Sequence, residues 1–95
     1  MTTLEKIKLA LRISHNKLDD DIQANIDACL ADLQVCGVTH AGEENPLILN
    51  AIKLYLRSLY TDDPAKGAEY LRRYESLKSC LMTAEGYGWE AAADD

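Results

Sequence analysis

Residues 45–60 read NPLILNAIKLYLRSLY, and this stretch decides the fold. Asn45 can cap a helix that begins at Pro46, because its side chain accepts a hydrogen bond from a free amide and proline is tolerated at the first helical position. The apolar side chains are too many for one narrow stripe: Leu47, Ile48, Leu49, Ala51, Ile52, Tyr55, Leu56, Leu59 and Tyr60. We therefore expect this helix to be buried on more than one side.

Two helices are predicted before this segment. The first begins after Thr2, whose hydroxyl can cap the amide of Glu5 while the Glu5 carboxylate reaches back. The second begins at Asp19, Asp20 and Asp21, where the helix dipole favours negative charge, with Asn16 as its expected cap. Gly37 is the natural stop of the second helix. The apolar positions recur at helical spacing: Leu4, Ile7 and Leu11 in the first helix, and Ile22, Ile26, Cys29, Leu30, Leu33 and Cys36 in the second.

A fourth helix is predicted after Asp63 and Pro64, which repeat the pattern of a cap followed by proline. Glu69 and Arg73 form a favourable pair, four residues apart, on its outer face. Its inward positions are Ala68, Leu71, Tyr74, Leu77 and Leu81. The fold class is therefore all-α: a small bundle of about four helices over residues 1–86, followed by a flexible acidic tail over residues 87–95.

Length and charge narrow the possible functions. A chain of 95 residues builds one compact core. Its net charge of −6 repels phosphate backbones, so sequence-specific binding to nucleic acid is not expected. The longest apolar run, Leu47 to Leu49, is far below the roughly 20 residues that cross a bilayer, and residues 1–6 lack a signal-peptide pattern. An odd number of cysteines fits a protein made in a reducing cytoplasm.

The sequence shows no recognisable catalytic, cofactor-binding or metal-binding motif. Cys29 and Cys36 lack a CxxC pattern and are interpreted as small core residues. His15 and His40 fall in predicted loops and are expected to be solvated. Asp19 to Asp21 lack the alternating ligands and glycine of a calcium loop, so helix-start electrostatics explains them better. We expect no enzyme activity and no cofactor.

The basic residues of the third and fourth helices are expected to form a solvated face with ion pairs, and not a phosphate-binding surface. These residues are Arg57, Lys66, Arg72, Arg73 and Lys78. Tyr55 and Tyr74 are interpreted as core aromatics. Tyr87 and Trp89 differ from these core tyrosines, because they lie beyond the last predicted helix and next to Gly86 and Gly88. No pocket of the chain is evident for them there. Tyrosine and tryptophan are favoured anchors at protein interfaces.

Together these segments resemble the small head-tail connector proteins of tailed bacteriophages, also described as head-completion or DNA-packaging proteins. LEKIKLALRIS and DDDIQANIDACLADL are similar to the opening helix pair of that family, and NPLILNAIKLYLRSLY to its third helix. AEYLRRYESLKSCLMTAEGYG resembles its last helix and its glycine-tyrosine ending. The most specific element is the aromatic end of the third helix, the short aspartate-rich turn and then YESLKSCL. Residues 89–95 match no part of the family pattern.

The resemblance implies a structural protein of the virion at the head-tail junction. Members form a ring, commonly of about twelve subunits, on the portal protein after DNA packaging, and present a surface to the next stopper or tail-completion protein. We expect Leu49, Leu56 and Tyr60 to bury neighbouring subunits or to complete the core beside them, and Tyr87 and Trp89 to bind the portal. The alternative is a small helical dimerising regulatory module of a mobile element, which would form a discrete dimer in isolation.

Overall fold

The computed structural model describes residues 1–38 and 45–83, which contain four α-helices and no strand. The helices are α1 (Thr3–Leu11), α2 (Asp19–Val35), α3 (Pro46–Tyr60) and α4 (Pro64–Thr83). The predicted all-α bundle is therefore confirmed, with each helix beginning within a few residues of its predicted start.

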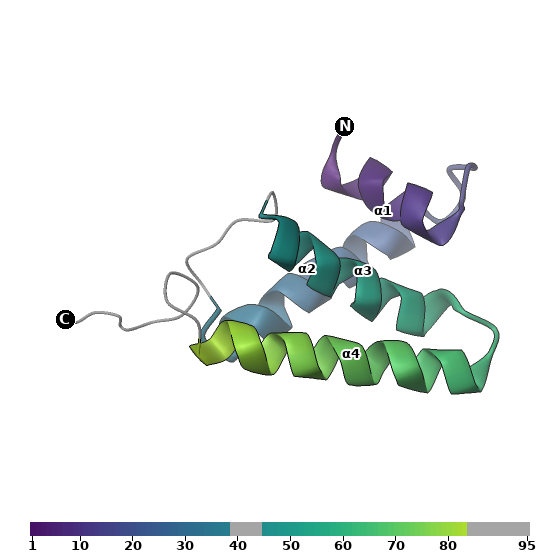
Figure 1. Ribbon diagram of the computed structural model, residues 1–95. Helices are drawn as coiled ribbons and strands as arrows, with labels where there is room; N and C mark the ends of the chain where they lie inside the picture. The colour runs from purple at the N-terminus through teal and green to yellow at the C-terminus, as the bar shows by residue number, and fades with distance from the viewer. Residues whose placement is uncertain (39–44, 84–95) are drawn as a thin grey trace.

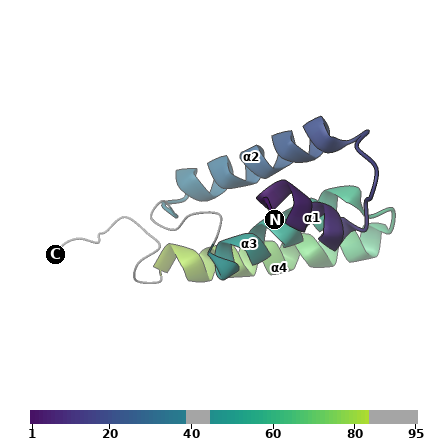
Figure 2. The same ribbon diagram turned by 90° about the horizontal axis from the view of Figure 1, so that it is seen from above.

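The helices are arranged around α3 (Figures 1 and 2). α3 and α4 run antiparallel and side by side, α1 crosses the bundle beside α3, and α2 stands apart along one side. α3 contacts all three other helices. This central position explains why residues 45–60 are apolar around more than one side, as predicted.

The core is formed by the predicted apolar stripes. Its buried side chains come from all four helices and from the residue after the turn that ends α2: Ile7, Ile22, Ile26, Cys29, Leu33, Val38, Ile48, Ala51, Ile52, Leu56, Tyr74 and Leu81. The Tyr55 and Tyr74 rings lie with their centroids 5.1 Å apart, and Tyr55 is partly buried. Tyr74 therefore belongs to the core and Tyr55 lies at its margin.

Three of the four predicted helix starts have the expected caps. Thr2 and Glu5 form the predicted capping box, with the Thr2 amide 2.7 Å from the Glu5 carboxylate. Asn45 accepts from the amide of Leu47 at 2.9 Å. Asp63 accepts from the amides of Ala65 and Lys66 at 3.0 and 3.3 Å. The cap predicted at Asn16 is wrong, because Leu18 occupies the N-cap of α2 and makes no side-chain cap bond.

α2 ends as predicted at Gly37, whose φ of 96° favours glycine. The amides of Gly37 and Val38 donate to the carbonyls of Gln34 and Leu33 at 3.0 and 2.9 Å, which is the Schellman pattern. The same pattern ends α1, but there the left-handed position, with a φ of 61°, is held by Arg12.

Two of the inward positions predicted for α4 are wrong. Ala68 is exposed, and Leu71 keeps 43% of its surface exposed. The start of α4 approaches α3 through Gly67, where an added Cβ would lie 3.4 Å from the Ser58 carbonyl oxygen. Because neighbouring positions are rotated by about 100° on a helix, the close approach at Gly67 leaves Ala68 to the side of the contact.

Candidate interaction surface

The expected interface residues of α3 have different environments. Leu56 is 0% exposed. It therefore completes the core of this chain and does not contact a neighbouring subunit. Leu49 and Tyr60 are partly buried and pack against the core cluster, so each retains some exposed surface. Leu59 is half exposed.

Tyr60 ties the end of α3 to the start of α2. Its hydroxyl donates to the Asp21 carboxylate and accepts from the Asn25 side-chain amide at 2.9 Å. Burial, together with the hydrogen bond to Asp21, raises the pKa of Tyr60, so the hydroxyl remains a donor at neutral pH. This contact fixes the Tyr60 ring beside the turn between α1 and α2.

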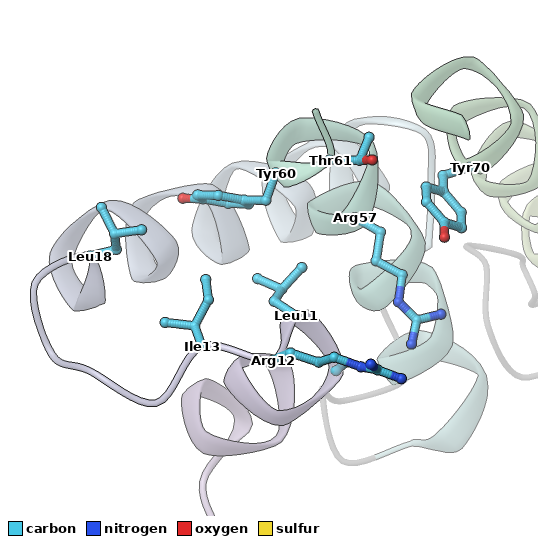
Figure 3. Close-up of a pocket in the computed structure, with 9 residues that line it drawn as sticks. Leu11, Arg12, Ile13, Leu18, Arg57, Tyr60, Thr61 and Tyr70 are labelled. Carbon is cyan, nitrogen blue, oxygen red and sulfur yellow. The ribbon is translucent and has the colours of Figure 1, made fainter. Parts of the chain in front are cut away.

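A pocket of about 330 Å³ lies beside this tyrosine, between the end of α1, the start of α2, the end of α3 and α4 (Figure 3). We call it the arginine pocket, because Arg12 and Arg57 both contribute to it and its lining residues include no acidic side chain. The apolar part is formed by Leu11, Ile13 and Leu18. Figure 3 shows the guanidinium groups of Arg12 and Arg57 on the same side of the pocket.

Arg12 and Arg57 take no part in the ion pairs found within residues 1–38 and 45–83. Arg57 lies 6.0 Å from the centroid of the Tyr70 ring, a cation–π distance. By contrast, Arg72 and Arg73 both bind Glu69, which confirms the predicted pair. Of the predicted basic face, Arg72, Arg73 and Lys78 form ion pairs within the described residues, whereas Arg57 and Lys66 do not.

A second tyrosine anchors the other half of α2. The Tyr74 hydroxyl donates to Asp32 at 2.6 Å, and Lys78 also binds Asp32 at 3.0 Å. The hydrogen bond from Tyr74, followed by Lys78, lowers the pKa of the Asp32 carboxyl despite some desolvation. Burial raises the pKa of the neighbouring Cys29 thiol to about 11, so Cys29 is a protonated core residue. Cys36 is half-buried and Cys80 exposed, so the core interpretation holds for Cys29 alone.

The model of the phage connector protein family matches residues 3–88, which includes all four helices. The chain belongs to this family. No curated protein and no solved structure gives a significant match to the sequence. Family membership makes the chain a structural connector protein of a phage and a component of the virion.

The remaining predictions for this connector protein concern its histidines, metal binding, membrane spanning and the C-terminal aromatic residues. His15 is exposed, and its Nδ1 accepts from the Lys17 amide at 3.2 Å. Within the described part of the chain, no group of three or more His, Cys, Asp or Glu residues could hold a metal ion. No helix there is long and apolar enough to span a bilayer. His40, Tyr87 and Trp89 lie outside the described residues.

Sequence reasoning missed the arginine pocket. Arg12 carried no signal, because it follows the last residue of α1. Arg57 was assigned to the solvated face. The pocket depends on how α1 and α4 meet the end of α3, which no local pattern encodes.

Proposed function

We propose that this protein is a head-tail connector adaptor, which assembles as a ring on the portal after DNA packaging and docks the next stopper or tail component. The observation that carries the proposal is the family match over residues 3–88. Membership favours this reading over a regulatory dimerisation module. The number of subunits, about twelve, comes from the resemblance.

The described surface supports assembly with other chains. Leu59 and Leu71, 50% and 43% exposed, line an open groove of about 500 Å³ where α3 meets α4. Leu49 and Tyr60 retain exposed surface on α3. Exposed apolar side chains that line a groove together, as Leu59 and Leu71 do, are typical of protein interaction sites. We assign subunit or partner contacts to Leu49 and Tyr60.

We assign portal binding to Tyr87 and Trp89, which follow the last described helix in the sequence. Their aromatic side chains offer large apolar area with few rotatable bonds, a combination that favours them as interface anchors.

Sedimentation velocity tests the assembly, first with the free chain over a range of concentrations and then with purified portal rings. We expect the protein to be a monomer or a labile oligomer alone and to bind stably to the portal. A discrete dimer alone that does not bind the portal would support the regulatory module instead. A strict monomer under both conditions would contradict the connector function.

The tail assignment needs a separate variant. Tyr87→Ala with Trp89→Ala should abolish portal binding and leave the helical circular dichroism signal unchanged. Asp94→Asn with Asp95→Asn is the matched control, because it alters the tail but keeps both aromatic residues. Undiminished portal binding by the aromatic variant would refute the assignment.

A further inference from the structure

The arginine pocket offers no carboxylate to pair with its two arginines. Two cationic side chains, Arg12 and Arg57, share a pocket whose lining has no carboxylate, although the chain as a whole carries sixteen acidic residues against ten basic ones. Like charges at close range repel each other, and a guanidinium group binds a carboxylate through two parallel hydrogen bonds. The pocket therefore suits a surface that presents carboxylates over small or apolar side chains.

α2 presents such a surface. This helix contains five aspartates and no lysine or arginine. Asp19 binds Lys8, Asp21 accepts from Tyr60, and Asp32 binds Tyr74 and Lys78, so three of the five are occupied within the chain.

The remaining two, Asp20 and Asp27, are exposed. Asp27 accepts a hydrogen bond from Gln23 on its own helix, at 3.0 Å. Asp27 is seven positions after Asp20, which is about two helical turns, so both lie on one face of α2 about 10 Å apart. Between and beside them are the exposed alanines Ala24, Ala28 and Ala31, whose small side chains allow another chain to approach closely. We call this surface the α2 outer face.

The two surfaces are formed by different residues, although the pocket includes Leu18 at the start of α2. α2 stands along one side of the bundle, whereas the pocket is formed mainly by α1, α3 and α4 (Figures 2 and 3). We propose that the arginine pocket of one copy receives the α2 outer face of a second copy, with Arg12 and Arg57 binding Asp20 and Asp27. A contact between two different surfaces is heterologous, and repeating such a contact gives a ring when the rotation between neighbouring copies closes after a whole number of subunits. The inference rests on the proposed self-assembly and identifies the surfaces that meet.

Charge-reversal variants in the full-length chain test this pairing. The pocket variant carries Arg12→Glu and Arg57→Glu, and the helix variant carries Asp20→Lys and Asp27→Lys. Assembly of each is measured by sedimentation velocity, alone and with purified portal rings, after circular dichroism has confirmed its helicity. Arg72→Glu with Arg73→Glu is the matched control for the pocket variant, because it makes the same change in net charge on the outer face of α4.

We expect subunit association to be at least about tenfold weaker in either charge-reversal variant and unchanged in the control. An equimolar mixture of the two variants should assemble again, because each then meets a surface of opposite charge in the other. Neither misfolding nor net charge can produce that rescue. Association of the natural chain should also weaken as salt concentration rises. If the pocket variant fails to fold, Arg12→Gln with Arg57→Gln replaces it and should also weaken association, but by less, because it removes the attraction without adding repulsion.

Several results would overturn the pairing. Normal assembly of the pocket variant, or a mixture of the two variants that fails to assemble, would contradict the pairing. Neither result would contradict the proposed connector function. If the helix variant assembles normally and loss follows only from Asp94→Lys with Asp95→Lys, the pocket takes the acidic tail instead. Failure of the natural chain to associate with itself or with the portal would contradict the proposed function, and the pairing with it.

Discussion

Leu56 and Leu59 lie one turn apart on α3 and differ almost completely in environment. Leu56 is 0% exposed, whereas Leu59 is 50% exposed. Replacing a buried leucine by alanine removes apolar contacts and leaves a cavity, so Leu56→Ala should lower the free energy of unfolding by about 2–5 kcal/mol. Leu59→Ala should lower it by less than about 1 kcal/mol. Urea denaturation of the two variants measures both. Equal losses would mean that Leu59 is as buried in solution as Leu56.

Tyr74 provides a prediction about pH. Tyr74→Phe removes the hydroxyl that donates to the Asp32 carboxylate at 2.6 Å and should lower the free energy of unfolding at pH 7 by about 1–2 kcal/mol. The pKa of Asp32 is lowered in the folded chain, chiefly by that hydroxyl. Its stabilising contribution is therefore complete above the ordinary aspartate pKa and is lost as the pH falls through the lowered value.

The destabilisation caused by Tyr74→Phe should consequently shrink as the pH falls below about 4, the ordinary pKa of aspartate, and Asp32 becomes protonated. Urea denaturation of both proteins across this range gives the measurement. Tyr55→Phe is the control, because Tyr55 lies beside Tyr74 and its hydroxyl makes none of the hydrogen bonds to Asp32. A pH-independent effect of Tyr74→Phe would show that the hydroxyl does not stabilise the carboxylate.

At the scale of elements, α2 is held to the rest of the bundle by one apolar stripe, by a tyrosine near each end and by the ion pairs of Asp19 with Lys8 and of Asp32 with Lys78. Tyr60 binds Asp21 in the first turn, and Tyr74 binds Asp32 eleven residues later. Because α2 packs less extensively against the other helices than α3 does, we expect α2 to open at a lower free energy than α3. Amide hydrogen exchange should be faster in α2 than in α3.

The two tyrosines should act on different halves of the helix. Tyr60→Phe should accelerate exchange in the first half of α2, and Tyr74→Phe in the second half. Exchange that increases uniformly along α2 in either variant would indicate that the helix opens as a single unit.

The sequence predicted the helices better than it predicted their contacts. Helix starts at Thr2, Asn45 and Asp63 and the stop at Gly37 are local events, in which a side chain or a backbone angle satisfies groups within a few residues. The predicted environments of Leu71 and Arg57 were wrong for a different reason. Their environments depend on the angle at which α4 leaves the turn after Tyr60, where Gly67 approaches α3 and Tyr70 lies beside Arg57. Such an angle follows from packing between helices and has no signature in either segment alone.

At the scale of the whole molecule, the described core spans the chain from Ile7 to Leu81. The predicted boundary between a helical domain and an acidic tail is testable on that basis. A chain truncated after Thr83 keeps every one of these buried side chains and all four helices. It loses four acidic residues, Glu85, Glu90, Asp94 and Asp95, and no basic residue, so repulsion within an acidic protein should decrease slightly.

The truncated chain should therefore unfold at the same urea concentration as the full chain, with a free energy within about 0.5 kcal/mol, as expected for changes away from the core. Truncation after Leu77 is the informative comparison, because it removes buried Leu81 and the last turn and a half of α4 and should cost several kcal/mol. If truncation after Thr83 were just as costly, residues 84–95 would have to be part of the folded domain. Assigning Tyr87 and Trp89 to the portal would then fail, since the chain itself would need them.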